Sequence, residues 1–337
     1  MTIHSIGDQA RAFALQAASN RIKTTLATLS EELSSGEVKD LSGRLGGNTR
    51  ILNDIEARLS MVAQYAKNAT EASSATQGMQ DALVSVNDIG LKLASSWLVE
   101  AGNETASTLA LHAADASAAF EATVARLNAS VGGRYLFAGT HTDQPPVSAA
   151  AQILDVLQAA VSGLTSAGDI AAAVSDWFDA APGAGGYVDM AYAGSIGETQ
   201  QVLIGENDSI MLRTNAVSPP LRDQMKALAT SALLDRGVLA GNHAERSDLL
   251  RRGGGALIAN RDALLGEMAR VGLNQQLVER AQSETSAAEA ALTTARNQLR
   301  SADPYQTAAA LTESQTQLET LYAVTARLSK LRLVDFL

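Results

Sequence analysis

The sequence predicts a mainly α-helical protein: a long antiparallel helical rod, similar to a coiled-coil bundle, is built from both chain ends, with a small α+β domain inserted in the middle. Three observations support this fold class. Apolar residues recur at spacings of three and four over 15–33 and again over 311–331, as on a helix that packs against another helix. The same spacing continues over 48–100 and 242–301. Residues 147–240 instead place glycine and proline turns between short segments of mixed periodicity, which is typical of a small α+β domain.

The first part of the chain predicts two helices joined by a polar connection. Residues 5–34 form the first helix, and Gly36 suits the left-handed position that ends it. The glycine-rich segment 35–47 connects it to a second helix over 48–100, which at 1.5 Å per residue would be roughly 75 Å long. Residues 101–103 (Ala-Gly-Asn) break this helix.

A third helix is predicted from 104 to 131, where Gly132 and Gly133 stop it. A short aromatic segment without helical periodicity follows at 134–140. Pro145 and Pro146 then end the segment that leads from the predicted rod into the inserted domain.

The middle of the chain predicts short elements of both kinds. The predicted helices are 149–163, 168–180 and about 15 residues after Pro219-Pro220, and the predicted strands are 187–193, 200–204 and 209–214. Residues 206–208 (Glu-Asn-Asp) suit a tight turn between the last two strands.

The C-terminal part returns to the rod pattern from about residue 242. Residues 251–255 (Arg-Arg-Gly-Gly-Gly) are predicted to interrupt it, and a long helix then runs to about Ser301. Asp303 suits a cap and Pro304 suits the first position of a terminal helix. The predicted domains are terminal assembly helices (1–40 and 303–337), a helical rod (41–145 and 241–302) and an inserted outer domain (146–240).

The composition excludes several classes of function. The 337-residue chain has a formal net charge of −10, so we expect no nucleic-acid binding. It contains no cysteine, which excludes disulfides, thiolate catalysis and cysteine-ligated metals. No run of about 18 apolar residues exists, so we expect no membrane insertion. Residues 1–20 contain Asp8 and Arg11 and no long apolar run, so we expect no cleaved secretory signal peptide.

The side chains that most often perform chemistry form no constellation. None of the four histidines has partners at metal-ligand spacing, so we expect no metal site. The glycines at 253–255 lack the Lys-Ser/Thr of a phosphate loop. Ser195 lies in a segment similar to a nucleophile elbow but without its first glycine. We therefore expect no enzyme and no cofactor, and an enzyme within 147–240 is the weakest alternative.

Four segments, in order, resemble a known family. They are Leu-Ser-Glu-Glu-Leu-Ser-Ser-Gly at 29–36, Gln-Tyr-Ala-Lys-Asn-Ala at 64–69, Gly-Arg-Tyr-Leu-Phe-Ala-Gly at 133–139, and the closing helix with Asp-Pro-Tyr-Gln-Thr-Ala at 303–308 and Leu-Ser-Lys-Leu-Arg-Leu-Val-Asp-Phe-Leu at 328–337. These segments resemble the FlgL-type hook–filament junction proteins (hook-associated protein 3) of the bacterial flagellin superfamily. The resemblance covers nearly all of 1–145 and 240–337.

The resemblance implies a structural subunit of the bacterial flagellum that joins hook to filament and serves motility. It implies an extracellular position, reached unfolded through the flagellar type III export channel. The implied partners are further copies of the chain in a tubular lattice, flagellin, a hook-side hook-associated protein and a cytoplasmic export chaperone.

Two alternatives remain open. A filament flagellin is the near one, although flagellins usually follow Ser-Ser-Gly with Arg-Ile-Asn and Asp-Asp-Ala patterns that residues 37–45 do not keep. A cytoplasmic coiled-coil signalling module is the remote one. Such a module would need no β-containing insertion and would be stable at both ends.

The terminal stripes are the predicted assembly interface, because two helices with one apolar stripe each cannot bury both stripes fully as an isolated pair. The residues expected there are Ile22, Leu26, Leu29, Leu33, Leu321, Val324, Leu328, Leu331, Phe336 and Leu337. Arg134, Tyr135 and Phe137 are expected to hold the rod to the inserted domain. Packing within the chain is the alternative for both sets.

Overall fold

The computed structural model describes the backbone of residues 6–99 and 105–334 and the side chains of residues 9–98 and 105–328. The fold class is confirmed: the described residues form long helices, with two small two-stranded sheets among them. The predicted break at 101–103 lies outside the described residues.

The chain divides into two compact units. The terminal unit is Met1–Met61 with Ala287–Leu337, and the central unit is Val62–Ser286. The predicted rod contributes residues to both units, so its separation from the inserted domain stays a prediction.

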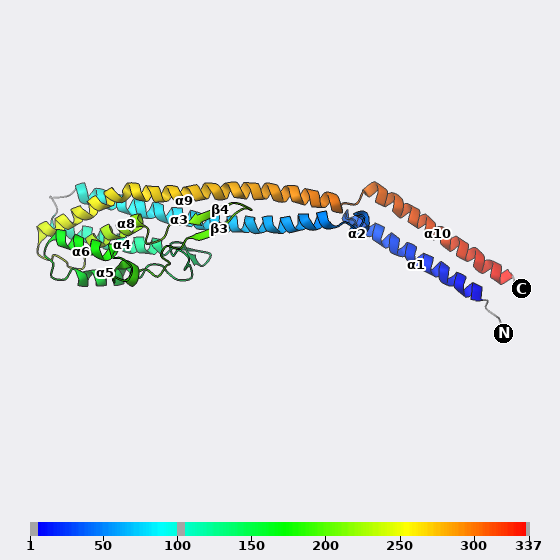
Figure 1. The fold of residues 1–337 in the computed structure, drawn as a ribbon, viewed down its shortest axis with the longest axis horizontal. Coiled ribbons are helices and arrows are strands. Elements are labelled where there is room, and N and C mark those ends of the chain that lie inside the picture. Colours follow the sequence, from blue (N-terminus) through cyan, green and yellow to red (C-terminus); the bar gives the residue numbers. More distant parts are fainter. Residues whose placement is uncertain (1–5, 100–104, 335–337) are drawn as a thin grey trace. The chain divides into compact units, whose positions relative to one another are not determined.

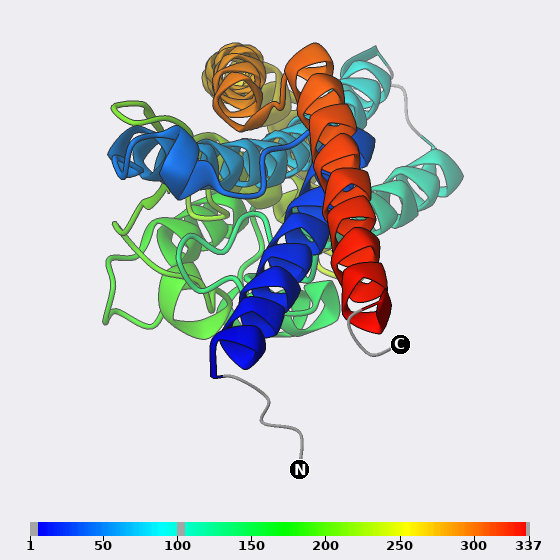
Figure 2. The same ribbon diagram turned by 90° about the vertical axis from the view of Figure 1, so that its right-hand side faces the viewer.

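The terminal unit is built around two antiparallel helices that lie side by side, α1 (Ile6–Ser35) and α10 (Pro304–Val334) (Figures 1 and 2). The predicted C-terminal end of α1 and the predicted start of α10 are confirmed. Gly36 follows α1 with a φ of 72°, and the Asp303 carboxylate accepts the N–H groups of Tyr305 (2.9 Å) and Gln306 (3.2 Å). The unit also contains α2 (Leu41–Arg44), the start of α3 (Arg50–Val99) and the end of α9 (His243–Arg300).

Short polar contacts join the segment after α1 to the end of α9. The Val38 N–H donates to the Arg300 carbonyl, and the Ala302 N–H donates to the Gly36 carbonyl, each at 2.8 Å. The Arg300 guanidinium lies 2.9 Å from the Glu37 carboxylate and 3.7 Å from that of Glu56. Gly36 thus has two roles, because it ends α1 and its carbonyl bonds to the chain just before α10.

The central unit contains the hydrophobic core. Its elements besides α3 and α9 are α4 (Ala106–Leu127), β1 (Ser130–Val131), β2 (Arg134–Tyr135), α5 (Ala150–Ala160), α6 (Ala167–Asp179), α7 (Tyr187–Met190), β3 (Gln200–Leu203), β4 (Ser209–Leu212) and α8 (Pro219–Ala232). Helix α8 packs against α4 and α6, and α5 packs against the same two helices. All buried residues of the core cluster lie between Ala69 and Ala281, so this unit has its own core.

Helix α9 is continuous from His243 to Arg300, so the predicted interruption at 251–255 is wrong. Gly253 and Gly254 are buried because α9 passes close to α3 and α8 there. A Cβ at Gly253 would lie 2.1 Å from the Ser231 hydroxyl and 3.4 Å from the Trp97 ring. These glycines allow close helix packing.

The third predicted helix is shorter than expected. Helix α4 ends at Leu127 and not at 131, because the side chain of Asn128 turns to the backbone of Val147. The Asn128 amide donates to the Val147 carbonyl (2.8 Å) and accepts the Val147 N–H (2.9 Å). The residues that follow form strand β1, which pairs with β2 around Gly132 and Gly133.

The predicted strand over 187–193 is also wrong, because its first residues form α7. The buried apolar residues of this segment are Tyr187, Val188, Ala191 and Tyr192, whereas Met190 is exposed. Positions i, i+1, i+4 and i+5 share one side of a helix, whereas a strand would bury alternate residues.

The predicted hairpin of β3 and β4 is confirmed, with Gln201 opposite Met211. Both of its outer edges are bonded to a helix. The Asn68 amide of α3 donates to the Leu203 carbonyl (2.8 Å), and the Asn274 amide of α9 donates to the Met211 carbonyl (3.0 Å).

Candidate assembly interface

The terminal helix pair buries very few of its own side chains. Within residues 9–35 of α1 no described side chain is buried, and within 304–328 of α10 only Thr307 is. Most helical stability in proteins comes from packing an apolar face. The α1–α10 pair therefore has apolar surface left to bury.

The residues predicted for assembly are partly covered by this pairing. Those half-buried in the structure are Ile22, Leu26, Leu29, Leu321 and Leu328. Leu33 is 39% exposed and Val324 is 43% exposed. The side chains of Leu331, Phe336 and Leu337 lie outside the described residues. Their role in assembly stays a prediction.

Two shallow grooves contain some of these residues. One, of about 350 Å³, brings Ile22 of α1 together with Leu321 and Val324 of α10; its other lining residues are Glu313, Thr316, Gln317 and Thr320. We call it the α10 groove. The second, of about 440 Å³, lies along α1 and is lined by Arg21, Thr24, Thr25, Thr28, Leu29 and Glu32. We call it the α1 groove.

Threonines form much of the lining of both grooves. The apolar periodicity of the sequence does not indicate them as interface residues. The hydroxyls of Thr316 and Thr320 donate to carbonyls four residues earlier, at 3.0 and 2.8 Å. Those of Thr24 and Thr25 do the same, at 3.0 and 3.1 Å. A hydroxyl bonded to its own helix leaves the methyl group outward. The spacing of four between Thr24 and Thr28, and between Thr316 and Thr320, was the available signal.

One polar contact crosses between the two helices. Lys23 and Ser19 of α1 hydrogen-bond to the Tyr322 hydroxyl of α10, and these bonds hold the pKa of that phenol below its usual value. The Lys23 ammonium lies 5.8 Å from the centroid of the Tyr322 ring. Because Tyr322 is 49% exposed, this contact orients the pair more than it stabilises it.

The second predicted set, Arg134, Tyr135 and Phe137, lies entirely in the central unit. Phe137 is fully buried, and its carbonyl accepts the Ala216 N–H at 2.9 Å. Arg134 is exposed and donates to the Thr142 hydroxyl at 3.3 Å. Arg134 and Tyr135 line a groove of about 670 Å³ beside β3 and α3. Phe137 alone of the three is a core residue, and the proposed holding role stays a prediction.

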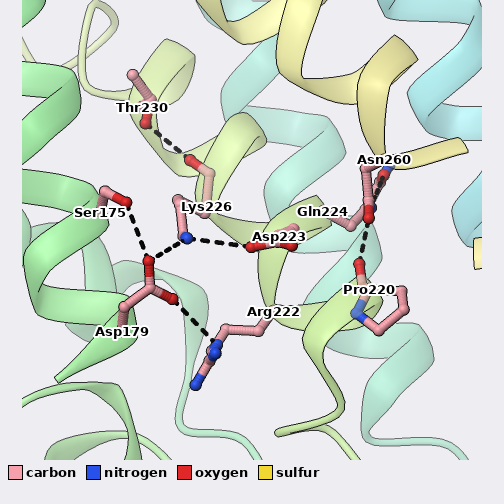
Figure 3. Close-up of polar contacts among 9 residues, drawn as sticks. All are labelled: Ser175, Asp179, Pro220, Arg222, Asp223, Gln224, Lys226, Thr230 and Asn260. Carbon is pink, nitrogen blue, oxygen red and sulfur yellow. Dashed lines mark hydrogen bonds and ion pairs between the residues drawn. The ribbon is translucent and has the colours of Figure 1, made fainter. Parts of the chain in front are cut away.

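A group of paired charges lies between α6 and α8 (Figure 3). Asp179 accepts a hydrogen bond from the Ser175 hydroxyl (3.0 Å), forms an ion pair with Arg222 (3.3 Å) and contacts Lys226. Partial burial raises its pKa, but the hydrogen bonds from Lys226 and Ser175 and both cations outweigh that effect, so the pKa lies below 3.8. Because its charges are paired with one another, the cluster joins two helices and leaves no group free to act as an acid or base.

A buried amide network lies next to this cluster (Figure 3). The Asn260 amide of α9 donates to the Pro220 carbonyl (2.7 Å), and the Gln224 amide of α8 donates to the Val86 carbonyl of α3 (3.2 Å). These bonds join three helices across the core. Buried amides that are satisfied in this way fix one packing arrangement.

Ser195 has a structural role. It is 4% exposed, and its hydroxyl accepts the Thr140 N–H at 2.8 Å. No three His, Cys, Asp or Glu side chains gather at metal-binding distance among the residues the structure describes. No described helix has an apolar stretch long enough to cross a bilayer.

Two solved structures resemble this fold. A candidate flagellar hook-associated protein from Vibrio parahaemolyticus is 14% identical, with a TM-score of 0.50, over 73% of this chain and 95% of that one. FlgL from Bacillus cereus is 16% identical, with a TM-score of 0.48, over 71% of this chain and 96% of that one. At these identities the first likeness shows the fold alone. No curated protein matches the chain.

Family models match both helical ends of the chain. Residues 6–142 match the bacterial flagellin N-terminal helical region, and residues 260–337 match the bacterial flagellin C-terminal helical region. Together these matches cover more than half of the sequence and both members of the α1–α10 pair. The chain therefore belongs to the bacterial flagellin family and is a structural subunit of the bacterial flagellum.

Proposed function

We propose that this subunit forms the layer between hook and filament and that α1 and α10 are its assembly segments. The observation that carries the proposal is the α1–α10 pair itself, which keeps Leu33 and Val324 exposed and leaves its other described apolar stripe residues half-buried. Contacts with neighbouring copies around a tube axis would bury this surface. The free energy gained would be about 25 cal/mol for each Å² covered.

The sequence supports a junction subunit over a filament subunit. Residues 29–36 end the first helix in Ser-Ser-Gly, but the segment that follows at 37–45 keeps neither flagellin pattern. In the structure this segment turns into α2 and contacts the end of α9. The hook-associated name of the Vibrio parahaemolyticus protein, which shares the fold, agrees with this choice.

A filament flagellin is the second candidate, because both matching family models are those of flagellin regions. Deleting the gene separates the two. Loss of a junction subunit leaves hooks without filaments and releases unpolymerised flagellin into the medium. Loss of a minor flagellin leaves filaments in place.

Location gives an independent test. Immunogold labelling of a tagged chain should place gold at a single zone where hook meets filament. Gold along the whole filament would overturn the junction proposal and favour the flagellin.

We also propose the partners that a junction position requires: further copies of this chain, flagellin, a hook-side hook-associated protein and a cytoplasmic export chaperone. Export unfolded through the flagellar type III channel would deliver the chain. Copurification of the chaperone with the full chain, and its loss when the C-terminal helix is removed, would support the chaperone contact.

A further inference from the structure

The outward face of α9 carries aliphatic side chains that the described part of the chain leaves uncovered. Leu273 is 61% exposed and Leu277 is 42% exposed. Gly266 lies on the same side of the helix, two turns before Leu273, and a Cβ there would meet nothing within 4 Å. Glycine weakens an exposed helix relative to alanine, and no described residue uses the space above Gly266. This face therefore combines apolar surface with an open notch.

Helix α4 has an outward face of a different kind. An exposed helix face is normally polar or charged, but Leu111 of α4 is 60% exposed. The other apolar residues exposed on that side are Ala114, Ala118, Ala122 and Ala125. Only three of the 22 residues of α4 are acidic or basic (Asp, Glu, Lys or Arg). The chain thus leaves a second apolar surface uncovered, and this one is made mostly of small side chains.

These two helices of the central unit run in the same direction. Helix α3 is antiparallel to α9, because Trp97 lies beside Gly253 and Gln77 lies beside Gln275. Helix α3 is antiparallel to α4 as well, because α4 begins soon after α3 ends and β1, which follows α4, lies beside Gly78. Helices α4 and α9 are therefore parallel. Copies that share one orientation around an axis can bring α4 of one copy against α9 of the next only in this parallel sense.

The two faces match in one parallel register. Their positions follow the same spacing of four, three, four, four and three residues along each helix. The corresponding positions are Ser107 with Asp262, Leu111 with Gly266, Ala114 with Ala269, Ala118 with Leu273, Ala122 with Leu277, and Ala125 with Arg280. Equivalent positions of parallel helices meet in layers. Each leucine then meets a glycine or an alanine, so that large side chains fill the space that small ones leave.

Charges at the two ends of the match select the same register and direction. Asp262 lies at the level of the first turn of α4, where the helix dipole favours an anion, and Arg280 lies at the level of the last turn, where it favours a cation. Arg280 is also within one turn of Glu121. Neither Asp262 nor Arg280 forms an ion pair with another residue that the structure describes. Antiparallel helices would exchange the two ends and make both contacts unfavourable.

We propose that the outward face of α4 in one copy packs, parallel, against the outward face of α9 in the next copy, with Leu111 over Gly266. The inference rests on the proposed partnership of this chain with further copies of itself. Both faces belong to the central unit, and they are different from each other. Each copy therefore offers one of each, and the contact repeats from copy to copy and does not stop at a dimer.

A change of side-chain size tests the pairing of Leu111 with Gly266. Gly266→Leu should lower the amount of this protein in sheared flagella by roughly tenfold or more, because the two leucines would overpack one layer. Leu111→Ala in the same chain should restore that amount.

Gly255→Leu is the matched control for this experiment. Gly255 is a second glycine on α9 with open space above it, but in this register it lies beyond the start of α4, so the change should have little effect. An equal loss from Gly255→Leu would overturn the register. Failure of the double variant to recover, with all monomers equally helical by circular dichroism, would overturn the pairing.

Engineered cysteines test the contact directly, because the chain has none of its own. Ala118→Cys with Leu273→Cys should form disulfide-linked ladders in isolated flagella, whereas Ala118→Cys with Leu277→Cys, one helical turn out of register, should not. Ladders from the second pair alone would overturn the register. If the first pair is present in flagella and gives no ladder, the contact fails alone. If the parent chain is absent from flagella, the proposed function itself fails.

Discussion

Gly253, Gly254 and Gly255 are consecutive in α9 but have different surroundings. Gly253 lies against Ser231, Ala227 and Trp97, and Gly254 lies against Leu98 and Trp97. A Cβ at Gly255 would meet nothing within 4 Å. The sequence alone predicts a flexible break from such a run, because it does not say which glycines face another helix. In the structure the first two permit contact with α3, and the third is exposed.

Alanine substitutions at Gly253 and Gly255 should therefore have opposite effects on the stability of the protein. Gly253→Ala should destabilise the protein by about 1–3 kcal/mol, because the added methyl overpacks a site bounded by the Ala227 carbonyl and the Trp97 ring. Gly255→Ala should stabilise it by about 0.5–1 kcal/mol through helix propensity. Thermal unfolding of both variants, followed by circular dichroism at 222 nm, measures the difference. If both variants changed the melting temperature equally, Gly253 would not lie in close contact with α3 and α8.

Asp179 predicts a pH dependence. Its pKa is lowered in the folded protein from an ordinary value of 3.8, so its charge stabilises the fold above its unfolded pKa. That contribution is lost as the pH falls through the folded pKa. Asp179→Asn should cost about 0.5–1 kcal/mol at pH 7, the size expected of a partly exposed ion pair. The difference from the parent chain should shrink as the pH falls through the lowered pKa of Asp179, and it should vanish in acid that protonates the folded carboxylate. Urea unfolding at pH 7 and in acid measures it, and a difference that persisted in acid would rule out the ion pair as its source.

At the level of elements, the helices of 11 residues or more were predictable, and the four-residue helices α2 and α7 were not. The period of three and four over tens of residues identified α1, α3 and α10 within a few residues of their described bounds. It also identified α9, but with a false interruption at 251–255. Helix α7 has four residues, too few for the period to distinguish a helix from a strand. Its conformation depends on burying Tyr187 and Tyr192 together, which is a tertiary effect.

The same limit applies to the candidate interface. The apolar stripes predicted Ile22, Leu321 and Val324 as interface residues, and the structure places all three in one groove. The apolar stripes did not include the threonines, because threonine carries a hydroxyl group and is counted as a polar residue. Its surface character in a helix depends on whether its hydroxyl bonds to the carbonyl four residues earlier.

Val324→Asp tests whether the terminal stripe serves assembly. Val324 is 43% exposed in the chain itself, so a carboxylate there should change the melting temperature of the monomer by no more than about 2 °C. In an assembly that buries the stripe it should abolish incorporation and swimming. Ala326→Asp places the same side chain on an exposed position of α10 outside the groove and should be tolerated. A large drop in monomer stability would instead show that Val324 serves internal packing.

On the scale of the whole molecule, the buried core lies within the central unit, and the described terminal helices add almost nothing to it. Regions with few buried apolar contacts open at low free energy and are the first to be cut by proteases.

Limited proteolysis of the purified monomer should therefore cleave first within 1–61 and 287–337, the two segments of the terminal unit. Mass spectrometry of the resistant material should recover 62–286. If the ends resist cleavage as well as the centre does, the apolar stripes of α1 and α10 are buried within the chain, as in a self-contained coiled coil. The experiment thus tests whether the terminal helices are held within the chain or left for assembly.

The amides of Asn68 and Asn274 have a consequence for how copies can meet. An unpaired strand edge offers backbone groups to any other strand, and aggregates grow by such edge-to-edge pairing. In this chain each outer edge of the four-residue strands β3 and β4 has a carbonyl already bonded to a neighbouring helix. These bonds occupy one backbone group on each edge and so disfavour pairing with the strand of another copy. In the assembly proposed above, contacts between copies would then form through helices, among them the terminal pair.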